Sequence, residues 1–170
     1  MSVAKPAHQS GVAVQFRAPR AEDGPAVSAL IDRCPPLDPN SAYCNLLQCT
    51  HFAETCIVAE RDGEIVGWIS GYRLPGAPDH YFLWQVAVSS TARGEGLGGR
   101  MLDALFLRPG LRGVTHMQTT ITPDNDASWA LFRGFARQRG AEIADRPFFD
   151  RDAHFGGAHA SEHLVTIGPF

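Results

Sequence analysis

The sequence lacks any apolar run of the roughly 18 to 20 residues that a membrane-spanning helix needs, which argues against an integral membrane protein. Its start has no apolar stretch of the kind found in signal peptides, and we expect residues 1–13 to form a disordered tail before one domain at 14–170. A net positive charge is also absent. The formal charge of −3 argues against a nucleic-acid partner held by an overall positive field, whereas a small-molecule ligand remains compatible.

The four cysteines contain no Cys-x-x-Cys pair, and no secretory signal precedes them. We therefore expect free thiols in a reducing cytoplasm rather than disulfides. Their spacings do not bring paired thiolates together, so the sequence predicts no metal. These residues are Cys34, Cys44, Cys49 and Cys56.

Hydrophobic spacing and turn residues predict a mixed α/β domain built on one sheet, without internal repeats. The order is neither a strict strand–helix alternation nor that of a barrel. The second helix is expected to bury Leu46, Leu47 and Phe52. In chain order the expected elements are a strand at 14–17, a helix beginning at 22–25, a loop at 34–40, a helix at 41–52, strands at 55–60, 64–73 and 81–88, a helix at 96–107, a strand at 114–121, a helix from 125 and a strand at 162–167.

The most informative segment is the glycine-rich run at 93–100, Arg-Gly-Glu-Gly-Leu-Gly-Gly-Arg. It follows the apolar segment 82–88 and leads directly into a predicted helix. A glycine turn between a strand and a helix exposes backbone N–H groups at the positive end of the helix dipole. This geometry binds anions and suits a pyrophosphate, to which Arg93 and Arg100 would add charge-assisted hydrogen bonds.

Two common kinds of phosphate-binding loop fit this run poorly. A nucleoside triphosphate loop requires Gly-Lys-Ser/Thr, but residues 99–101 read Gly-Arg-Met. The dinucleotide-binding fingerprint Gly-x-Gly-x-x-Gly does occur in this run, as Gly94, Gly96 and Gly99. However, an antiparallel meander precedes these glycines, and the following strand lacks the acidic residue that binds the ribose.

A third kind of loop fits better. The pattern Arg93-x-x-Gly96-x-Gly98, after a strand ending Val-Ala-Val, resembles the coenzyme A loop of the GCN5-related N-acetyltransferase (GNAT) superfamily. Asn125-x-x-Ser128 opens a segment similar to the helix in which that family's Asn contacts the pantetheine arm. The resemblance covers almost the whole chain. It implies a mostly antiparallel mixed sheet, splayed between its central strands and flanked by helices, with acetyl-CoA as cosubstrate. The expected contacts with acetyl-CoA are Val86, Ala87, Val88, Arg93, Gly94, Glu95, Gly96, Leu97, Gly98, Gly99, Arg100, Asn125, Ser128 and Phe132.

Further segments resemble one branch of that superfamily, the L-2,4-diaminobutyrate acetyltransferases of ectoine biosynthesis. The most specific is the block Leu-Asp-x-Asn-Ser-x-Tyr at 37–43, and segments at 52–59, 82–88, 120–125 and 161–164 agree. The resemblance implies acetyl transfer to the γ-amine of diaminobutyrate. The product, N-γ-acetyl-diaminobutyrate, is then cyclised by another enzyme to the compatible solute ectoine.

An amino-acid acceptor must be held by its α-ammonium and α-carboxylate so that only the γ-nitrogen reaches the thioester. An ammonium calls for carboxylates, for which Asp38 and Glu162 are the candidates, and Trp84 would close the pocket. Each of these residues also has a structural explanation that competes with acceptor binding. The structural roles are a turn or helix cap, packing in the core, and a solvated strand end. The full set of acceptor candidates is Asp38, Asn40, Ser41, Tyr43, Trp84 and Glu162.

The reaction needs a free amine, whose ammonium form has a pKa near that of lysine, roughly 10.4, so a group or a water chain must accept a proton. Glu162, His163 and Asp38 are the available types. The oxyanion would meet the backbone N–H of Val86, and we expect direct attack in a ternary complex. In many members of the superfamily a Tyr in the Asn-helix protonates the departing thiolate, but its slot here is Phe132, which leaves the acid unassigned.

Two alternatives stay open at this point. One is an acetyltransferase for another small amine, such as a polyamine or an amino acid. The other is a coenzyme A-binding sensor without catalysis, which the missing Tyr favours. The sequence leaves the oligomeric state open, with a homodimer among the options, and it assigns no role to His154 or His159.

Overall fold

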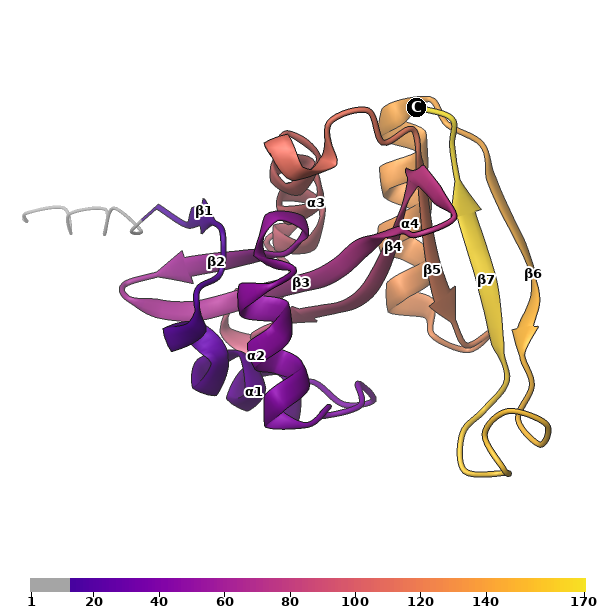
Figure 1. The fold of residues 1–170 in the computed structure, drawn as a ribbon, viewed down its shortest axis with the longest axis horizontal. Helices are drawn as coiled ribbons and strands as arrows, with labels where there is room; N and C mark the ends of the chain where they lie inside the picture. Colours follow the sequence, from indigo (N-terminus) through magenta and orange to yellow (C-terminus); the bar gives the residue numbers. More distant parts are fainter. Residues whose placement is uncertain (1–12) are drawn as a thin grey trace, which may run out of the picture.

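A single seven-stranded sheet forms the centre of the molecule in this computed structural model, which describes residues 13–170 (Figure 1). The strand order is β1-β2-β3-β4-β5-β7-β6, and every neighbouring pair is antiparallel except the parallel pair β4–β5. The predicted tail at 1–13 lies almost entirely outside the described residues. The strands are β1 Gln15–Arg17, β2 Ile57–Arg61, β3 Glu64–Leu74, β4 Ala77–Val88, β5 His116–Ile121, β6 Ile143–Phe149 and β7 Glu162–Ile167.

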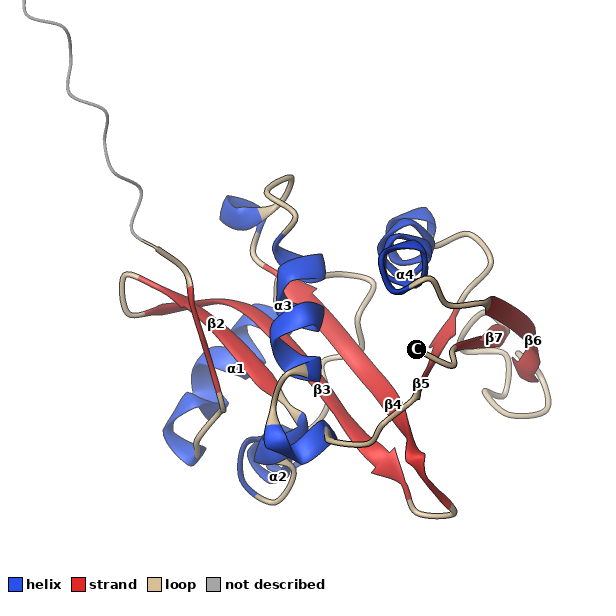
Figure 2. Ribbon diagram, turned by 90° about the horizontal axis from the view of Figure 1, so that it is seen from above, coloured by secondary structure: helices blue, strands red, loops and turns tan. Residues whose placement is uncertain are grey.

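Four α-helices cover the two faces of the sheet (Figure 2). On one face, α1 packs with β2 and β3 around Val58 and Trp68, and α2 lies against α1. On the other face, α3 and α4 enclose the larger core around Met101 and Phe135. None of the helices in residues 13–170 is both long and apolar enough to cross a bilayer. The helices are α1 Gly24–Asp32, α2 Ala42–Thr50, α3 Leu97–Phe106 and α4 Asp126–Arg139.

The sheet is splayed between its two central strands, as expected. The parallel pairing of β4 with β5 is confined to three positions, where 80–82 meets 116–118. Beyond Phe82 the two strands diverge, which Figure 2 shows as the gap between β4 and β5. A β-bulge lies at the point of divergence, because Ser70 faces Gln85 and Gly71 faces Leu83, which leaves Trp84 as the extra residue of β4. Bulges bend their strand and increase its twist, so this one helps to turn β4 away from β5.

Three expectations about the elements were wrong. The structure adds β6, which sequence reasoning missed because Pro147 and neighbouring charges are typical of an exposed edge strand. β4 begins at Ala77, four residues before the strand predicted at 81–88, and so includes Pro78. On α2, Leu46 is 38% exposed and Phe52, just beyond the helix, is 44% exposed, whereas α2 buries Asn45, Gln48 and Cys49. On this buried face Asn45 accepts from Asn40 of the preceding loop and donates to Ser28 of α1, whereas Gln48 has no partner within residues 13–170.

Candidate functional site

The glycine turn between β4 and α3 leaves open space beside its backbone. Gly94 and Gly96 have φ of 79° and 68°, a region that favours glycine. A Cβ added at Gly94, Gly96 or Gly99 would meet no atom within 4 Å. A Cβ at Gly98 would instead lie 3.3 Å from Leu131 of α4. Gly98 therefore permits close packing of two helices, while the other three glycines leave room for a ligand.

Backbone amides in this turn are unsatisfied. The first intrahelical bond runs from Arg100 N to Gly96 O at 3.2 Å, so the helix leaves the preceding amides without partners. Within the described part of the chain, no other hydrogen bond reaches the amides of residues 94–99. The carboxylate of Glu95 is bound by Arg61 of β2, which removes a repulsive charge from an anion approaching these amides. The turn thus presents free backbone donors of the kind that an anion site requires.

Two arginines flank the turn. The Nε of Arg93 donates to the carbonyl of Val88 at 3.2 Å, which folds this side chain back toward the end of β4 while it stays exposed. Arg100 lies over the ring of Phe16, with its guanidinium carbon 5.5 Å from the ring centroid. Both cations are close in sequence to the free amides and are reachable from solvent, so each can supply a charged donor to a phosphate.

The start of α4 carries the predicted pantetheine contacts. The side chain of Asn125 accepts from Ser128 N at 3.1 Å and so caps the helix, and its amide group keeps two donors. Phe132 packs in the core, 3% exposed, and carries no acidic proton. Tyr81 does not replace it as an acid, because its hydroxyl is buried and donates to the carbonyl of Thr55 at 2.9 Å. Burial raises the pKa of Tyr81 well above its usual value.

The free edge of β4 faces the gap in the sheet. On its other side β4 pairs with β3. Just beyond β4, the backbone amide of Ser89 donates to the carbonyl of Val66 at 2.9 Å. Amides of alternate residues in an antiparallel strand point to opposite sides. The N–H groups of Val86 and Val88 therefore point toward β5, which has already diverged at this level. This arrangement supplies an amide donor at Val86 for an oxyanion, and an edge for an extended amide-bearing ligand.

The predicted acceptor loop is fastened to the same stretch of β4. The side-chain amide of Gln85, which is 4% exposed, donates to the carbonyl of Asp38 at 2.7 Å. Its oxygen accepts from the side chain of Asn40 at 2.8 Å. Ser41 caps α2 by accepting from the amide of Cys44 at 3.1 Å. The capping role predicted for Ser41 is confirmed, while the carboxylate of Asp38 stays exposed and available to an ammonium.

Exposed aromatic side chains lie on β4 and at both ends of α2. Trp84, the bulge residue of β4, is 47% exposed, and Tyr43 at the start of α2 is 72% exposed. Trp84 is therefore not a core residue, which favours its predicted role at the pocket. On the neighbouring strands Tyr72 and Phe82 have ring centroids 5.5 Å apart, and Phe52 lies 6.4 Å from Tyr72. A hydrophobic wall thus extends from α2 across β3 to β4.

Glu162 and His163, at the start of β7, point to opposite faces of the sheet because successive residues of a strand alternate. His163 shares its face with Val165, which belongs to the core under α3 and α4. Its Nδ1 lies 2.7 Å from a carboxylate oxygen of Asp145 on β6. Glu162 shares the opposite face, that of α1 and α2, with Leu164. The structure therefore places Glu162, rather than His163, on the side of the acceptor loop.

The long connection between β6 and β7 approaches the acceptor loop. The Nε2 of His159 lies 3.9 Å from the carboxylate of Asp38. The sequence assigned no role to His159, and the proximity appears only in the fold, since the two residues are 121 positions apart. This contact brings the segment 150–161 to the acceptor side of the splayed sheet.

Sequence reasoning missed a polar layer under α1 and α2. Besides Gln85, it contains Asn45, whose side-chain amide donates to the hydroxyl of Ser28 at 2.8 Å. Ser70 of β3 lies directly opposite Gln85, and the buried side chains of Ser70 and Gln48 have no partner within residues 13–170. Buried polar groups usually pair with protein, water or ligand. The signal for Gln85 was present, as a polar residue in an otherwise apolar strand, but only the fold gives it a partner.

All four cysteines, which lie in the described part of the chain, are free thiols. Burial raises the pKa of Cys49 to about 11 and that of Cys56 to about 12. Cys34 is far from the glycine turn in sequence but close in space. Its Sγ lies 3.5 Å from the carbonyl of Val88 and 3.8 Å from the guanidinium of Arg93.

An open hollow of about 720 Å³ lies between α1, the β2–β3 hairpin and residues 89–91. Its most central charged residues are paired with one another. Arg17 donates to Asp23 at 2.7 Å and to Glu60 at 2.8 Å, and this pairing holds the pKa of Arg17 above its usual value. We therefore place the functional site in the splayed sheet.

The sequence profile of the acetyltransferase (GNAT) family matches residues 25–135. Full-length relatives carry a more specific name. The chain is 52% identical over 152 residues to the L-2,4-diaminobutyric acid acetyltransferase of Methylotuvimicrobium alcaliphilum, with 89% of this chain and 88% of that protein covered. It is 51% identical over 156 residues to the enzyme of the same name from Halomonas elongata, with 91% and 81% covered.

Solved structures point to the same family as these relatives. Diaminobutyrate acetyltransferase EctA from Paenibacillus lautus, in complex with its substrate L-2,4-diaminobutyric acid and coenzyme A, matches with a TM-score of 0.90 and 39% identity, covering 94% of this chain and 96% of that one. The loading GNATL domain of CurA from Lyngbya majuscula shares the fold alone, with a TM-score of 0.71 and 17% identity over 92% and 98% of the two chains. This chain therefore belongs to the GNAT acetyltransferase family, and within it to the L-2,4-diaminobutyric acid acetyltransferases.

Proposed function

We propose that this enzyme transfers the acetyl group of acetyl-CoA to the 4-amino group of L-2,4-diaminobutyrate, which is the acetylation step of ectoine biosynthesis. The observation that carries the proposal is the coincidence of three features at one end of β4. These are a glycine turn with unpaired amides, a strand edge facing a gap, and an acceptor loop tied to that strand. Each feature serves a different part of the two substrates.

Coenzyme A binding follows from the turn and the gap. The amides at 94–99 bind the pyrophosphate, and the missing side chains at Gly94, Gly96 and Gly99 leave room for it. The exposed edge of β4 at Val86 and Val88 pairs with the amides of the pantetheine arm. The thioester then lies in the gap between β4 and β5, close to the acceptor loop.

Diaminobutyrate is bound through attraction between its positive α-ammonium group and acidic side chains. The carboxylates of Asp38 and Glu162 hold the α-ammonium, and Trp84 covers the short carbon chain. Because these groups fix the α-carbon end, the γ-nitrogen is the one directed to the thioester. The buried Gln85 keeps Asp38 in place, so that acceptor binding depends on a residue that need not touch the acceptor.

Transfer proceeds by direct attack of the free γ-amine on the thioester carbonyl within a ternary complex. The N–H of Val86 stabilises the oxyanion without reorganisation, because the strand already holds it in place. The C–N bond forms first, and collapse of the tetrahedral oxyanion then breaks the C–S bond, so that the thiolate leaves as coenzyme A. A water chain or Glu162 accepts the amine proton, since His163 is on the other face of the sheet and paired with Asp145.

Steady-state kinetics with a panel of acceptors test the proposal. Release of free thiol should be fastest with L-2,4-diaminobutyrate and slower with ornithine, lysine and putrescine, because the pocket fixes both charge and chain length. Equal rates across the panel would support a general small-amine acetyltransferase. Binding of acetyl-CoA without turnover of any acceptor would support a sensor.

Two further expectations concern the cell and the assembly. We propose a cytoplasmic location, which the four free thiols support, since a reducing compartment keeps cysteines unpaired. A homodimer stays a prediction. Sedimentation of the purified enzyme would test it.

A further inference from the structure

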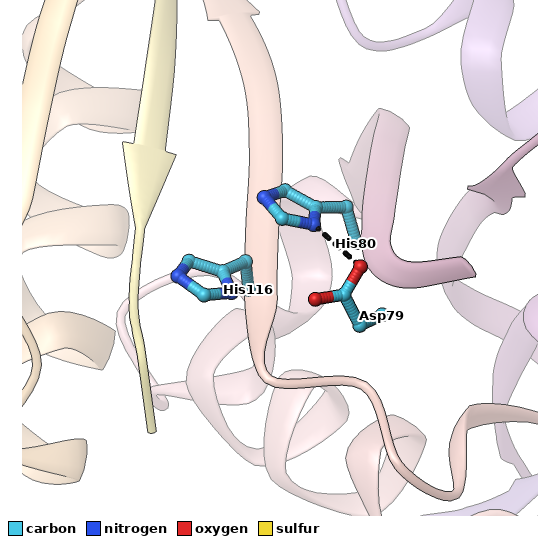
Figure 3. Close-up of side chains that lie close together, drawn as sticks. All are labelled: Asp79, His80 and His116. Atoms are coloured by element: carbon cyan, nitrogen blue, oxygen red, sulfur yellow. Dashed lines mark hydrogen bonds and ion pairs between the residues drawn. The ribbon is translucent and has the colours of Figure 1, made fainter. Parts of the chain in front are cut away.

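Two histidines and an aspartate come together where β4 and β5 begin to pair (Figure 3). The rings of His80 and His116 are stacked, with centroids 4.4 Å apart and planes 3° from parallel. The Nδ1 of His80 lies 3.0 Å from a carboxylate oxygen of Asp79. Figure 3 shows this carboxylate beside the edges of both rings, and one ligand atom of each residue lies within 4.8 Å of the other two.

We propose that Asp79, His80 and His116 bind one divalent transition-metal ion of the zinc type. Two imidazole nitrogens and a carboxylate oxygen are a ligand set that Zn²⁺ accepts, with water in the fourth position. Mg²⁺ and Ca²⁺ prefer oxygen ligands, and thiolates are absent from this cluster, so the donor set selects a borderline cation. The sequence predicted no metal on the basis of its cysteine spacings, and the pair Asp79 and His80 is 36 positions away from His116 along the chain.

The backbone that carries these ligands is fixed from both sides. His80 and His116 are directly paired in the β4–β5 register. The amide of Thr115 donates to the carbonyl of Asp79 at 2.9 Å, and the amide of Phe170 donates to the carbonyl of Thr115 at 3.0 Å. The ligands are therefore held together by the fold itself, which lowers the ordering cost of binding an ion.

Side-chain movement completes the site. A tetrahedral ion with bonds of about 2.0 to 2.2 Å places its ligand atoms about 3.4 Å apart, so the present separations must contract by up to roughly 1.4 Å. The two stacked rings must also tilt toward the ion, because the lone pair of an imidazole nitrogen lies in the plane of its ring. Asp79 is exposed and both histidines are partly exposed, so the ion can reach all three side chains from solvent. The Nδ1 of His116 now lies 2.9 Å from the hydroxyl of Thr115, and binding through this nitrogen replaces that contact.

The position of the cluster defines what the ion does. The β4–β5 pairing at 80–82 and 116–118 is the closed end of the splayed sheet. An ion between His80 and His116 ties the two strands there. Val86 is six residues further along β4, about 20 Å at strand spacing, so the ion is structural and takes no part in acetyl transfer.

The test uses the full-length enzyme, freed of metal with a chelator and kept without coenzyme A, whose thiol would compete for zinc. Calorimetric titration with Zn²⁺ should show one site. At a free Zn²⁺ concentration of 100 times the dissociation constant, the melting temperature should rise by about 5 to 11 °C. His80→Gln and, separately, Asp79→Asn should each weaken zinc binding by about tenfold or more.

Two variants serve as controls. His51→Gln removes an exposed histidine outside the cluster, and Thr115→Val removes the competing hydroxyl, so neither should weaken binding. Asp79→Asn changes an exposed side chain and should keep the melting temperature of the metal-free protein, which separates lost ligation from lost folding. Equal zinc affinity in wild type, His80→Gln and Asp79→Asn would overturn the proposal, as would the lack of a stoichiometric site in the wild type.

Co²⁺ substitution identifies the ligands directly. A histidine and carboxylate site gives visible d–d bands without the near-ultraviolet charge-transfer band of a cobalt–thiolate bond. Such a spectrum, lost in His80→Gln, supports the cluster. A thiolate band lost in Cys44→Ser would place the ion on the cysteines and overturn the assignment.

Discussion

The side-chain amide of Gln85 donates to the backbone carbonyl of Asp38 at 2.7 Å, which joins the acceptor loop to the strand whose next residue is Val86. The same side chain accepts from Asn40. One buried residue thus holds the predicted ammonium ligand in register with the predicted oxyanion donor. We therefore expect the distance between the two bound substrates to depend on this contact.

Replacing Gln85 by Leu should raise the KM for diaminobutyrate roughly 30-fold, because two buried hydrogen bonds worth about 1 kcal/mol each are lost and their partners are left unpaired. The KM for acetyl-CoA should change little. Steady-state kinetics in both substrates measure the two effects separately. Gln138→Leu is the matched control, since Gln138 is exposed and bonds only Asp103. Unchanged acceptor KM in Gln85→Leu would contradict the positioning role.

Gly96→Val should weaken coenzyme A binding by at least about tenfold, because the new side chain enters space reserved for the pyrophosphate and strains a positive φ. Gly113→Val is the control for strain alone. Gly113 also has a positive φ, of 82°, with open space around it, but it lies beyond the other end of β4. Equilibrium binding and thermal melts of both variants separate the two causes. Similar affinity for coenzyme A in the two variants would refute the assignment of the turn.

Glu162→Gln should raise the KM for diaminobutyrate by about tenfold or more, since a charged hydrogen bond to the α-ammonium is worth roughly 1.5 to 3 kcal/mol. His163→Gln should leave the acceptor KM nearly unchanged, because His163 is on the opposite face and pairs with Asp145. Kinetics of the two variants at saturating acetyl-CoA make the comparison. If His163→Gln raises the KM for diaminobutyrate more than Glu162→Gln does, the assignment of these two side chains to opposite faces of β7 is wrong.

Cys34→Ser should keep acetyl transfer within about twofold of wild type, because direct attack needs no acyl-thiol. Initial velocities should give intersecting lines in double-reciprocal plots. Parallel lines, together with an inactive Cys34→Ser, would establish a thiol intermediate, for which the contact between Cys34 and Arg93 offers a site.

Alkylation of the native enzyme should spare Cys49 and Cys56. A thiol reacts as its thiolate, and a pKa of about 11 or 12 leaves a thiolate fraction on the order of 10⁻³ or 10⁻⁴ at pH 8. The reactive fraction of each thiol rises only as the pH approaches these values. Mass spectrometry after brief iodoacetamide treatment measures the labelling of each cysteine. Labelling of Cys56 at the rate of a free thiol would contradict its burial.

Local patterns along the chain predicted most of the fold. The apolar run before the glycines predicted β4, and the glycines themselves marked the start of α3, because both signals are contained in adjacent residues. The edge strand β6 escaped notice because Pro147 and exposed charges weaken the usual strand pattern. The polar buried face of α2 was also missed, since Asn45 is buried only by virtue of partners on other elements.

Only part of the site could be predicted, because the sequence reveals features formed by adjacent residues but not contacts between distant segments. The glycine turn before α3 is a local feature, and the sequence located it. The pairing of Asp38 with Gln85 and the approach of His159 to Asp38 arise between segments far apart in the chain. The zinc-type cluster likewise requires β4 to lie beside β5, a pairing that residue types alone do not reveal.

The most direct test of the account is the identity of the acetylated product. The purified enzyme would be incubated with acetyl-CoA and an equimolar mixture of L-2,4-diaminobutyrate, ornithine and putrescine, and the products would be assigned by mass spectrometry and NMR. The account predicts that N-γ-acetyl-diaminobutyrate predominates, with the α-amine unmodified. Predominance of an acetylated polyamine, or of the α-acetyl isomer, would contradict it.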